Sequence, residues 1–238
     1  MERLDEFQQK IGYGFRNERL LVQALTHSSY ANEHGLKLSD NERLEFLGDA
    51  VLEVLTSDYL YHLHTDWPEG ELTKYRASIV CEQTLAFCAR KISLGEYLRL
   101  GKGEEHMGGR KRPSIVSDAF EAVIGAVYLD SGFGEAEKFI RRFVLDDIDN
   151  TRLFYDSKTI LQEMVQAEEK GSLSYHLLGE TGPDHNKSFL VEARIGDRPV
   201  SRGEGHTKKA AEQEAAYRAI LILREQETES DSEVNSSV

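Results

Sequence analysis

Apolar positions recur every third or fourth residue along the first 150 residues of the chain, as at Leu44, Leu47, Val51 and Leu55. This spacing places the apolar side chains on one face of a helix, and convincing strand-like alternation is absent from this part of the chain. Polar turn segments separate the helical stretches. The pattern therefore predicts an all-α domain over residues 1–150.

The pattern changes after a short polar segment, a candidate linker at residues 146–157. An amphipathic helix follows, then three runs with strand character separated by turns, and finally an alanine-rich helix. We expect these elements at residues 157–170, 174–178, 188–195, 198–204 and 207–224. The sequence thus predicts a multi-domain protein in which an α+β domain of order α-β-β-β-α, residues 156–226, follows the all-α domain.

Composition narrows the class of protein. The chain of 238 residues carries 29 Lys and Arg against 42 Asp and Glu, a formal net charge of −13, and 39% of its residues are hydrophobic. Residues 227–238 form an acidic tail that is too polar to pack, which predicts disorder. No apolar run approaches the roughly 20 residues of a membrane span, and the start lacks a secretory signal. Cys81 and Cys88 have the spacing of neither a disulfide framework nor a metal knuckle, so we expect core or near-core thiols in a cytoplasmic protein without a membrane partner.

Acidic residues interrupt an otherwise apolar helix in the segment NERLEFLGDAVL, residues 41–52. Glu42, Glu45 and Asp49 fall within about 60° of one another on a helix. Carboxylates at this spacing repel one another, and the repulsion grows in a low-dielectric cleft. A bound divalent cation would remove that penalty, so the stripe is a candidate metal site.

A second apolar helix, residues 117–129, repeats the arrangement with Asp118 and Glu121 on one face and Gly125 continuing that face without a side chain. For one such stripe, a solvated helix face is the alternative. Two stripes in two apolar helices, with no lysines at helical spacing, favour convergence of the carboxylates from two packed helices. All-oxygen ligation suits a hard ion such as Mg²⁺ or Mn²⁺.

The stretch NERLEFLGDAVLE at residues 41–53 resembles the signature of the ribonuclease III family, and residues 12–30, 72–86 and 117–130 are similar to further stretches of that family. The resemblance covers nearly the whole chain except the acidic tail. It implies a helical endonuclease domain that forms a homodimer, followed by a double-stranded RNA-binding domain. By motif position it implies a metal-binding set and a catalytic set of acids. The metal-binding set is Glu45, Asp49, Asp118 and Glu121, and the catalytic set is Asp49, Glu121, Glu42 and Glu69.

The same resemblance implies an activity. The expected enzyme hydrolyses double-stranded RNA with Mg²⁺, for which Mn²⁺ substitutes, and needs no small-molecule cofactor. It leaves 5′-phosphate and 3′-hydroxyl ends, with one site per strand in the dimer and a two-nucleotide 3′ overhang, and it processes ribosomal and messenger RNA. Two other functions stay open on the residues alone: a non-catalytic RNA-binding scaffold and a helical metal-dependent nucleotide hydrolase.

Lys208 and Lys209 stand in the first turn of the last helix, where cations oppose the helix dipole. An RNA phosphate bound at this helix start would interact favourably with both lysines and with the helix dipole. The alternative is that the two lysines are surface residues without a ligand. Together with two other regions, these lysines resemble the RNA contacts of double-stranded RNA-binding domains. The first helix of the α+β domain and the loop that contains His185 would contact minor grooves, and the lysines would contact phosphates. The residues concerned are Thr159, Gln162 and Glu163 in the helix, His185 in the loop, and Lys208 and Lys209.

Weaker candidates remain. The basic segment 110–113 contacts RNA or is a solvated loop, and the sequence leaves both open. His27 is expected to cap and pack a helix junction rather than to activate a nucleophile. His62 and His64 are expected at the surface.

Overall fold

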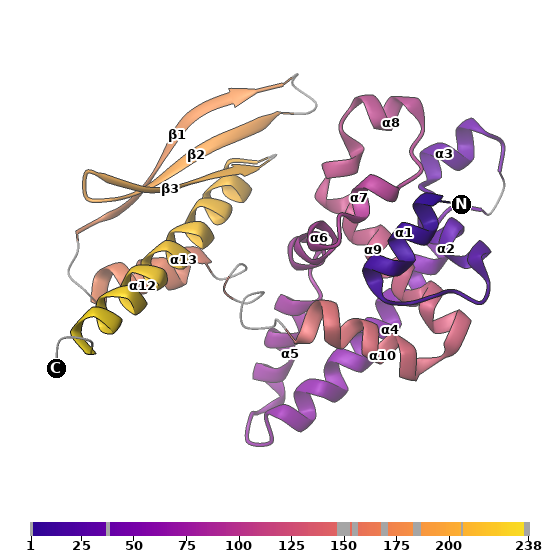
Figure 1. The fold of residues 1–238 in the computed structure, drawn as a ribbon, viewed down its shortest axis with the longest axis horizontal. Coiled ribbons are helices and arrows are strands. Elements are labelled where there is room, and N and C mark those ends of the chain that lie inside the picture. Colours follow the sequence, from indigo (N-terminus) through magenta and orange to yellow (C-terminus); the bar gives the residue numbers. More distant parts are fainter. Residues whose placement is uncertain are drawn as a thin grey trace. The chain divides into compact units, whose positions relative to one another are not determined.

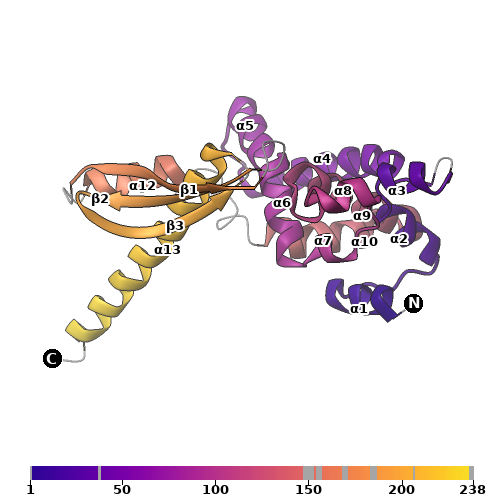
Figure 2. The same ribbon diagram turned by 90° about the horizontal axis from the view of Figure 1, so that it is seen from above.

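The computed structural model describes residues 2–36, 39–146, 153, 157–167, 171–182, 187–205 and 207–235, with side chains as far as Glu225. Contacts between residues divide the chain into two compact units, unit 1 (Met1–Thr151) and unit 2 (Arg152–Val238). Unit 1 consists of helices, and unit 2 contains a three-stranded sheet and two helices (Figure 1 and Figure 2). The predicted fold class, an all-α domain followed by an α-β-β-β-α domain, is confirmed. In the described parts of the chain, no helix combines the length and the hydropathy needed to cross a membrane.

The regular elements that the structure describes in unit 1 are helices joined by turns and loops, with one isolated bridge between Thr26 and Arg99. Its elements are α1 (Glu2–Ile11), α2 (Glu18–Ala24), α3 (Ser28–Glu33), α4 (Glu42–Leu63), α5 (Glu69–Ile79), α6 (Glu82–Lys91), α7 (Leu94–Tyr97), α8 (Lys102–His106), the 3₁₀ turn η1 (Gly109–Lys111), α9 (Pro113–Ser131), α10 (Phe133–Ile140) and the π-helical turn η2 (Arg141–Leu145). Polar caps and proline start several of them. The Asn17 side chain accepts a hydrogen bond from the Arg19 N–H at the start of α2, and Pro113 occupies the first turn of α9.

Helix α9 is the centre of the core of unit 1. Nearly every residue from Ile115 to Val127 is buried, and the helix packs against α4, α6, α2 and α10. The contact with α4 is unusually close because two glycines face it. A Cβ atom at Gly48 would overlap the carbonyl oxygen of Glu121, and one at Gly125 would overlap the carbonyl oxygen of Leu44. The absence of both side chains lets the two backbones touch, which brings the acidic stripes of α4 and α9 together.

Unit 2 contains α12 (Ser157–Ala167), β1 (Leu173–Thr181), β2 (Ser188–Ile195), β3 (Arg198–Gly205) and α13 (Lys208–Asn235). The strands pair antiparallel in the order β1-β2-β3, and the two helices cover one face of the sheet (Figure 2). Alternation of side chains directs Val191 and Ala193 of β2 toward α13, where they meet Ala211 and Ala215 in a buried cluster. A second cluster, which includes Leu161, lies between α12 and α13.

Two elements differ from the sequence prediction. Strand β1 extends to Thr181, three residues into the segment that we predicted as a turn, because those residues pair with the start of β2. Helix α13 continues to Asn235, past the predicted end at Arg224. Residues 225–235 contain no glycine or proline, so nothing in the sequence stops the helix there. Disorder of residues 227–238 in solution stays a prediction.

Candidate active site and RNA-binding surface

Three carboxylates converge where α4 crosses α9. Glu45, Asp118 and Glu121 each offer one oxygen, and these atoms all lie within 4.8 Å of one another. All three residues are partly buried. Glu45 comes from the first turns of α4, and Asp118 and Glu121 come from successive turns of α9. The predicted convergence of the two acidic stripes is therefore present for these residues, and we call them the carboxylate cluster.

Burial and mutual repulsion raise the pKa values of the carboxylate cluster. Burial raises the pKa of Glu121 to about 8, and the nearby charges of Asp49, Glu45 and Asp118 add to the effect. Burial is also the main cause of the raised pKa of Glu45, with Asp118, Glu42 and Asp49 contributing. The pKa of Asp118 is raised by burial, while a hydrogen bond from Ser117 and the charge of His27 act in the opposite direction. A cation held between these oxygens would relieve the same repulsion.

The other predicted acids of α4 border the carboxylate cluster. Asp49 and Glu42 are exposed, and neither belongs to the group of oxygens within 4.8 Å. Both lie close enough for their charges to raise the pKa of Glu45, and the charge of Asp49 also acts on Glu121. Asp49 therefore stands at the solvent side of the cluster, one helical turn after Glu45.

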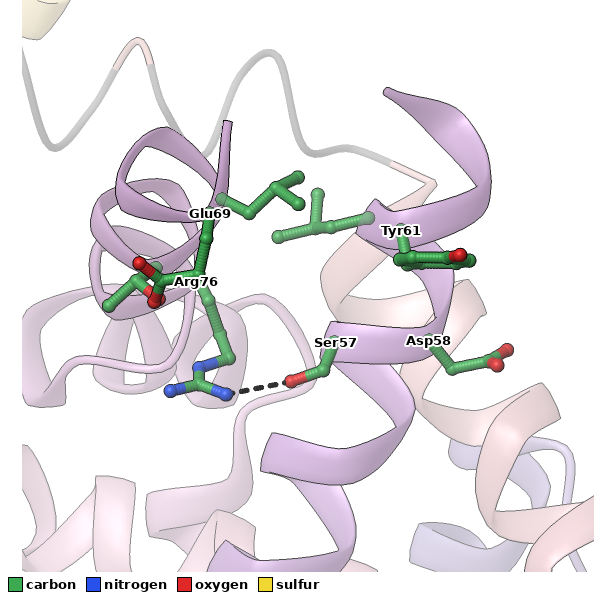
Figure 3. A pocket seen from close by; sticks show the side chains of 8 residues that line it. Ser57, Asp58, Tyr61, Glu69 and Arg76 are labelled. Carbon is green, nitrogen blue, oxygen red and sulfur yellow. Dashed lines mark hydrogen bonds between the residues drawn. The ribbon is translucent and has the colours of Figure 1, made fainter. Parts of the chain in front are cut away.

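Glu69 lies apart from the carboxylate cluster. It opens α5, where its carboxylate accepts a hydrogen bond of 2.8 Å from the Thr73 hydroxyl. It lines a cavity of about 340 Å³ between α4 and α5 (Figure 3), whose wall includes Leu60, Tyr61 and Leu72. Figure 3 also shows the Arg76 guanidinium of α5 donating to the Ser57 hydroxyl of α4 at 2.9 Å. Within one chain, the described residues thus do not bring Glu69 to the other predicted acids.

The basic segment is largely occupied by contacts inside unit 1. Arg110 donates to the carbonyl oxygens of Gly95, Glu96 and Leu98, and also to the Glu105 carboxylate. Arg112 forms an ion pair with Glu104 at 2.6 Å. Lys111 is exposed. Two of the three cations therefore hold the chain between α7 and α9, and only Lys111 offers a charge to an external ligand.

The weaker histidine and cysteine predictions have mixed outcomes. His27 caps α3, accepting a hydrogen bond from the Ser29 N–H, as predicted for a helix junction. His62 is exposed, as predicted. The surface position predicted for His64 is wrong, since it is half-buried and stacks on Trp67 with ring centres 3.7 Å apart. Cys88 is buried and Cys81 half-buried, which agrees with the predicted core or near-core thiols.

The predicted RNA contacts of unit 2 that the structure describes are all exposed. Thr159, Gln162 and Glu163 follow one another on the outer face of α12, away from the buried Leu161. Lys208 and Lys209 open α13, where the Thr207 hydroxyl accepts a hydrogen bond from the Ala210 N–H. His185 lies outside the described residues. The surface therefore combines a polar helix face with two cations at a helix N-terminus, a suitable place for phosphate.

Sequence reasoning missed three features of these sites. Phe46, next to Glu45, lies in an apolar helix and is nevertheless 80% exposed, which the sequence does not predict. Gly48 gave a visible signal, a glycine in the middle of a helix, which usually has a packing reason. The ion pair between Lys158 and Glu212 joins residues 54 positions apart and gave no local signal.

Comparisons with known proteins agree with the two-unit fold. A family model described as ribonuclease-III-like matches residues 17–148, and a double-stranded RNA binding motif matches residues 157–223. The chain is 50% identical over 223 residues to "Ribonuclease 3" of Caldanaerobacter subterraneus subsp. tengcongensis, covering 92% of this chain and 98% of that protein. It is 48% identical over 226 residues to "Ribonuclease 3" of Listeria innocua, covering 94% and 99%.

A solved structure also resembles unit 1. It is the nuclease domain of ribonuclease III from Campylobacter jejuni, described as flexible in a region involved in dimer formation. It is 40% identical to this chain with a TM-score of 0.57, and the match covers 60% of this chain and 96% of that domain.

Proposed function

The chain belongs to the ribonuclease III family, and from this premise we propose that its carboxylate cluster holds the divalent cations that serve hydrolysis of double-stranded RNA. The chain is an endoribonuclease for double-stranded RNA, with a nuclease domain and a double-stranded RNA binding motif in one polypeptide. We assign residues 1–150 to the nuclease domain and 156–226 to the RNA-binding domain. The observation that carries the metal proposal is the approach of Glu45, Asp118 and Glu121 within 4.8 Å of one another.

The donor set fits a hard cation. Its atoms are carboxylate oxygens, which Mg²⁺ and Mn²⁺ prefer, and no sulfur or imidazole nitrogen is among them. Asp49 would complete the set from the solvent side. The raised pKa of Glu121 means that loading the site displaces a proton from a group that holds it without metal. When bound, a divalent cation supplies positive charge that favours deprotonation of water and stabilises the leaving oxygen.

The residues of the chain then have separate roles in the reaction. A water oxygen bonds to phosphorus and the bond from phosphorus to the 3′-oxygen breaks. The departing 3′-oxygen takes a proton from solvent water, which leaves a 5′-phosphate and a 3′-hydroxyl. Glu45 and Asp118 are fixed on two packed helices. They would hold the divalent cations, and these cations would keep the reacting phosphate in place. Asp49 and Glu42 are exposed carboxylates beside the cluster, able to accept the proton of the attacking water.

We also propose that two copies pair through α4. Phe46, Val54 and Tyr61 are 80%, 57% and 69% exposed and lie on one side of this helix. In a two-fold interface the same patch serves both copies. With Val54 near the axis, Phe46 of one copy faces the cavity beside Tyr61 of the other, and Glu69 of that second copy approaches Glu45 of the first. Such a dimer offers one site to each strand of a duplex and gives Glu69 a route to the acids that it does not reach within its own chain.

The roles beyond cleavage follow the family. We propose that the enzyme works in the cytoplasm on precursors of ribosomal and messenger RNA. The duplex regions of such precursors fit a surface that contacts phosphates and minor grooves rather than individual base edges.

The decisive experiment compares Asp49→Asn and Glu121→Gln with the unchanged protein on long duplex RNA in Mg²⁺. We expect cleavage to fall on the order of 100-fold or more, because several kcal/mol of charge stabilisation are lost. Glu18→Gln, which neutralises an exposed acid on α2, is the matched control and should cut normally. EDTA should stop cleavage by every variant.

Several outcomes would refute the assignment. Normal cutting by either Asp49→Asn or Glu121→Gln would remove those residues from the site. Duplex binding without cleavage in Mg²⁺ or Mn²⁺ would indicate a scaffold. Hydrolysis of nucleoside triphosphates with intact duplex RNA would indicate a nucleotide hydrolase.

A further inference from the structure

An ion pair joins α12 and α13, the two helices of unit 2 that carry expected RNA contacts. The ammonium of Lys158, in the first turn of α12, lies 2.5 Å from a carboxylate oxygen of Glu212, in the second turn of α13. The two side chains are 40% and 29% exposed, so the pair is shielded from water on part of its surface. The same ammonium lies 4.9 Å from the centre of the Tyr175 ring on β1. Lys158 therefore has a fixed position between three elements.

A neighbouring hydrogen bond fixes the same junction. The hydroxyl of Ser157, which is fully buried, donates to the carbonyl oxygen of Gln213 at 2.9 Å. Tyr175 lies beside the same junction. Burial raises the pKa of its hydroxyl to about 12, and the nearby Glu212 charge adds to the effect. Two consecutive residues of α12 thus contact two consecutive residues of α13, which sets the position of one helix along the other.

Glu212 stands four residues after Lys208, so the two side chains are neighbours on the same face of α13. A carboxylate at this position has two effects on an RNA contact at Lys208: it competes for the ammonium, and it repels an arriving phosphate. In the structure Lys208 points instead toward the Phe189 ring, 5.9 Å from its centre, and it forms no ion pair with any carboxylate that the structure describes. The Glu212 carboxylate is already engaged by Lys158.

We propose that Lys158 is a positioning residue for RNA binding: by holding the Glu212 carboxylate, it keeps the Lys208 ammonium available to a phosphate of the duplex. This rests on the proposed role of Lys208 as a phosphate contact. Lys158 acts through Glu212 and does not itself touch the RNA. Its neighbour Thr159 lies on the exposed face of α12 proposed to meet a minor groove, so the same pair also sets the distance between the two contact regions.

The test measures the affinity of the full chain for duplex RNA in EDTA, where cleavage is stopped, over a series of salt concentrations. Lys158→Met keeps the aliphatic stem over Tyr175 and removes the charge. We expect this variant to bind several-fold more weakly, with the largest loss at low salt because the effect is electrostatic. Glu212→Gln should bind at least as tightly as the unchanged protein, and Lys158→Met with Glu212→Gln should bind like Glu212→Gln alone. Lys158→Arg should preserve binding.

Each contrary result has its own meaning. A double variant that stays as weak as Lys158→Met alone would show that Lys158 contacts RNA directly, and normal affinity of Lys158→Met would show that the pair is irrelevant to binding; both overturn the proposal. Thermal unfolding of each variant separates a loss of affinity from a loss of fold, since a variant that binds weakly but unfolds at the same temperature as the unchanged protein has lost affinity alone. Lys208→Met tests the premise: we expect weaker binding and a salt slope smaller by about one. Normal binding by Lys208→Met would remove the proposed phosphate contact, and the inference with it.

Discussion

At the scale of single residues, Glu121 links the fold to the chemistry. It sits on a buried helix, in contact with the α4 backbone, and three other acids surround its carboxyl group. With a pKa of about 8, this group holds its proton at neutral pH as long as no cation is bound. A cation bound at the proposed metal site would displace this proton, and we therefore expect magnesium to bind more tightly as the pH rises toward 8.

The raised pKa predicts how the stability of the metal-free protein depends on pH. Unfolded Glu121 loses its proton near pH 4.5, whereas the folded group keeps it to about pH 8, so the folded state binds more protons between these values. The contribution of Glu121 to stability is complete below about pH 4.5 and is lost as the pH rises to about 8. Urea unfolding in EDTA should show a steeper loss of stability over this range for the unchanged protein than for Glu121→Gln. Equal slopes for the two proteins would contradict the assigned environment.

Residue chemistry could be predicted from the sequence where spacing on a helix decides it. Glu45, Asp118 and Glu121 were placed correctly because positions three and four apart must share a face. Glu69 could not be placed by the same reasoning, since its position depends on how α5 folds back against α4. Phe46 was missed because an apolar side chain in an apolar helix gives no sign of whether a neighbour covers it.

At the scale of elements, the crossing of α4 and α9 determines the site. The two backbones are in contact at Gly48 and Gly125, so each acidic stripe lies directly over the other helix. The existence and order of the helices and strands could be predicted because their periodicities are strong. The ends of β1 and α13 could not be predicted. Pairing with β2 extends β1, and α13 continues because the sequence contains no signal that stops the helix.

Replacing one of these glycines should separate the helices. Gly48→Ala places a methyl group on the Glu121 carbonyl oxygen, and we expect a loss of about 1–3 kcal/mol in the free energy of unfolding from overpacking. Activity in Mg²⁺ should fall as well, because the carboxylate cluster widens. Gly103→Ala, on α8 with open space at its Cβ position, is the matched control and should unfold like the unchanged protein. Unchanged stability of Gly48→Ala would refute the close contact.

At the scale of the whole molecule, the exposed apolar stripe on α4 bears on whether two copies form a dimer. Phe46→Ser should shift the protein from dimer to monomer in sedimentation experiments, because it removes the most exposed side chain of that stripe. Leu177→Ser removes an apolar side chain of unit 2 that is 44% exposed, and should leave the dimer intact. A dimer that survives Phe46→Ser at low micromolar concentration would exclude α4 as its centre.

The two hydrophobic cores have a bearing on synthesis at the ribosome. All the carboxylates of the cluster precede Glu163 and the lysines of α13 in the chain, and each core is closed by residues of its own unit. Domains generally fold as they emerge, starting from the N-terminus. The carboxylate cluster of unit 1 can therefore form while unit 2, which carries the expected RNA contacts, is still being translated, and we expect an unfinished chain to bind duplex RNA weakly.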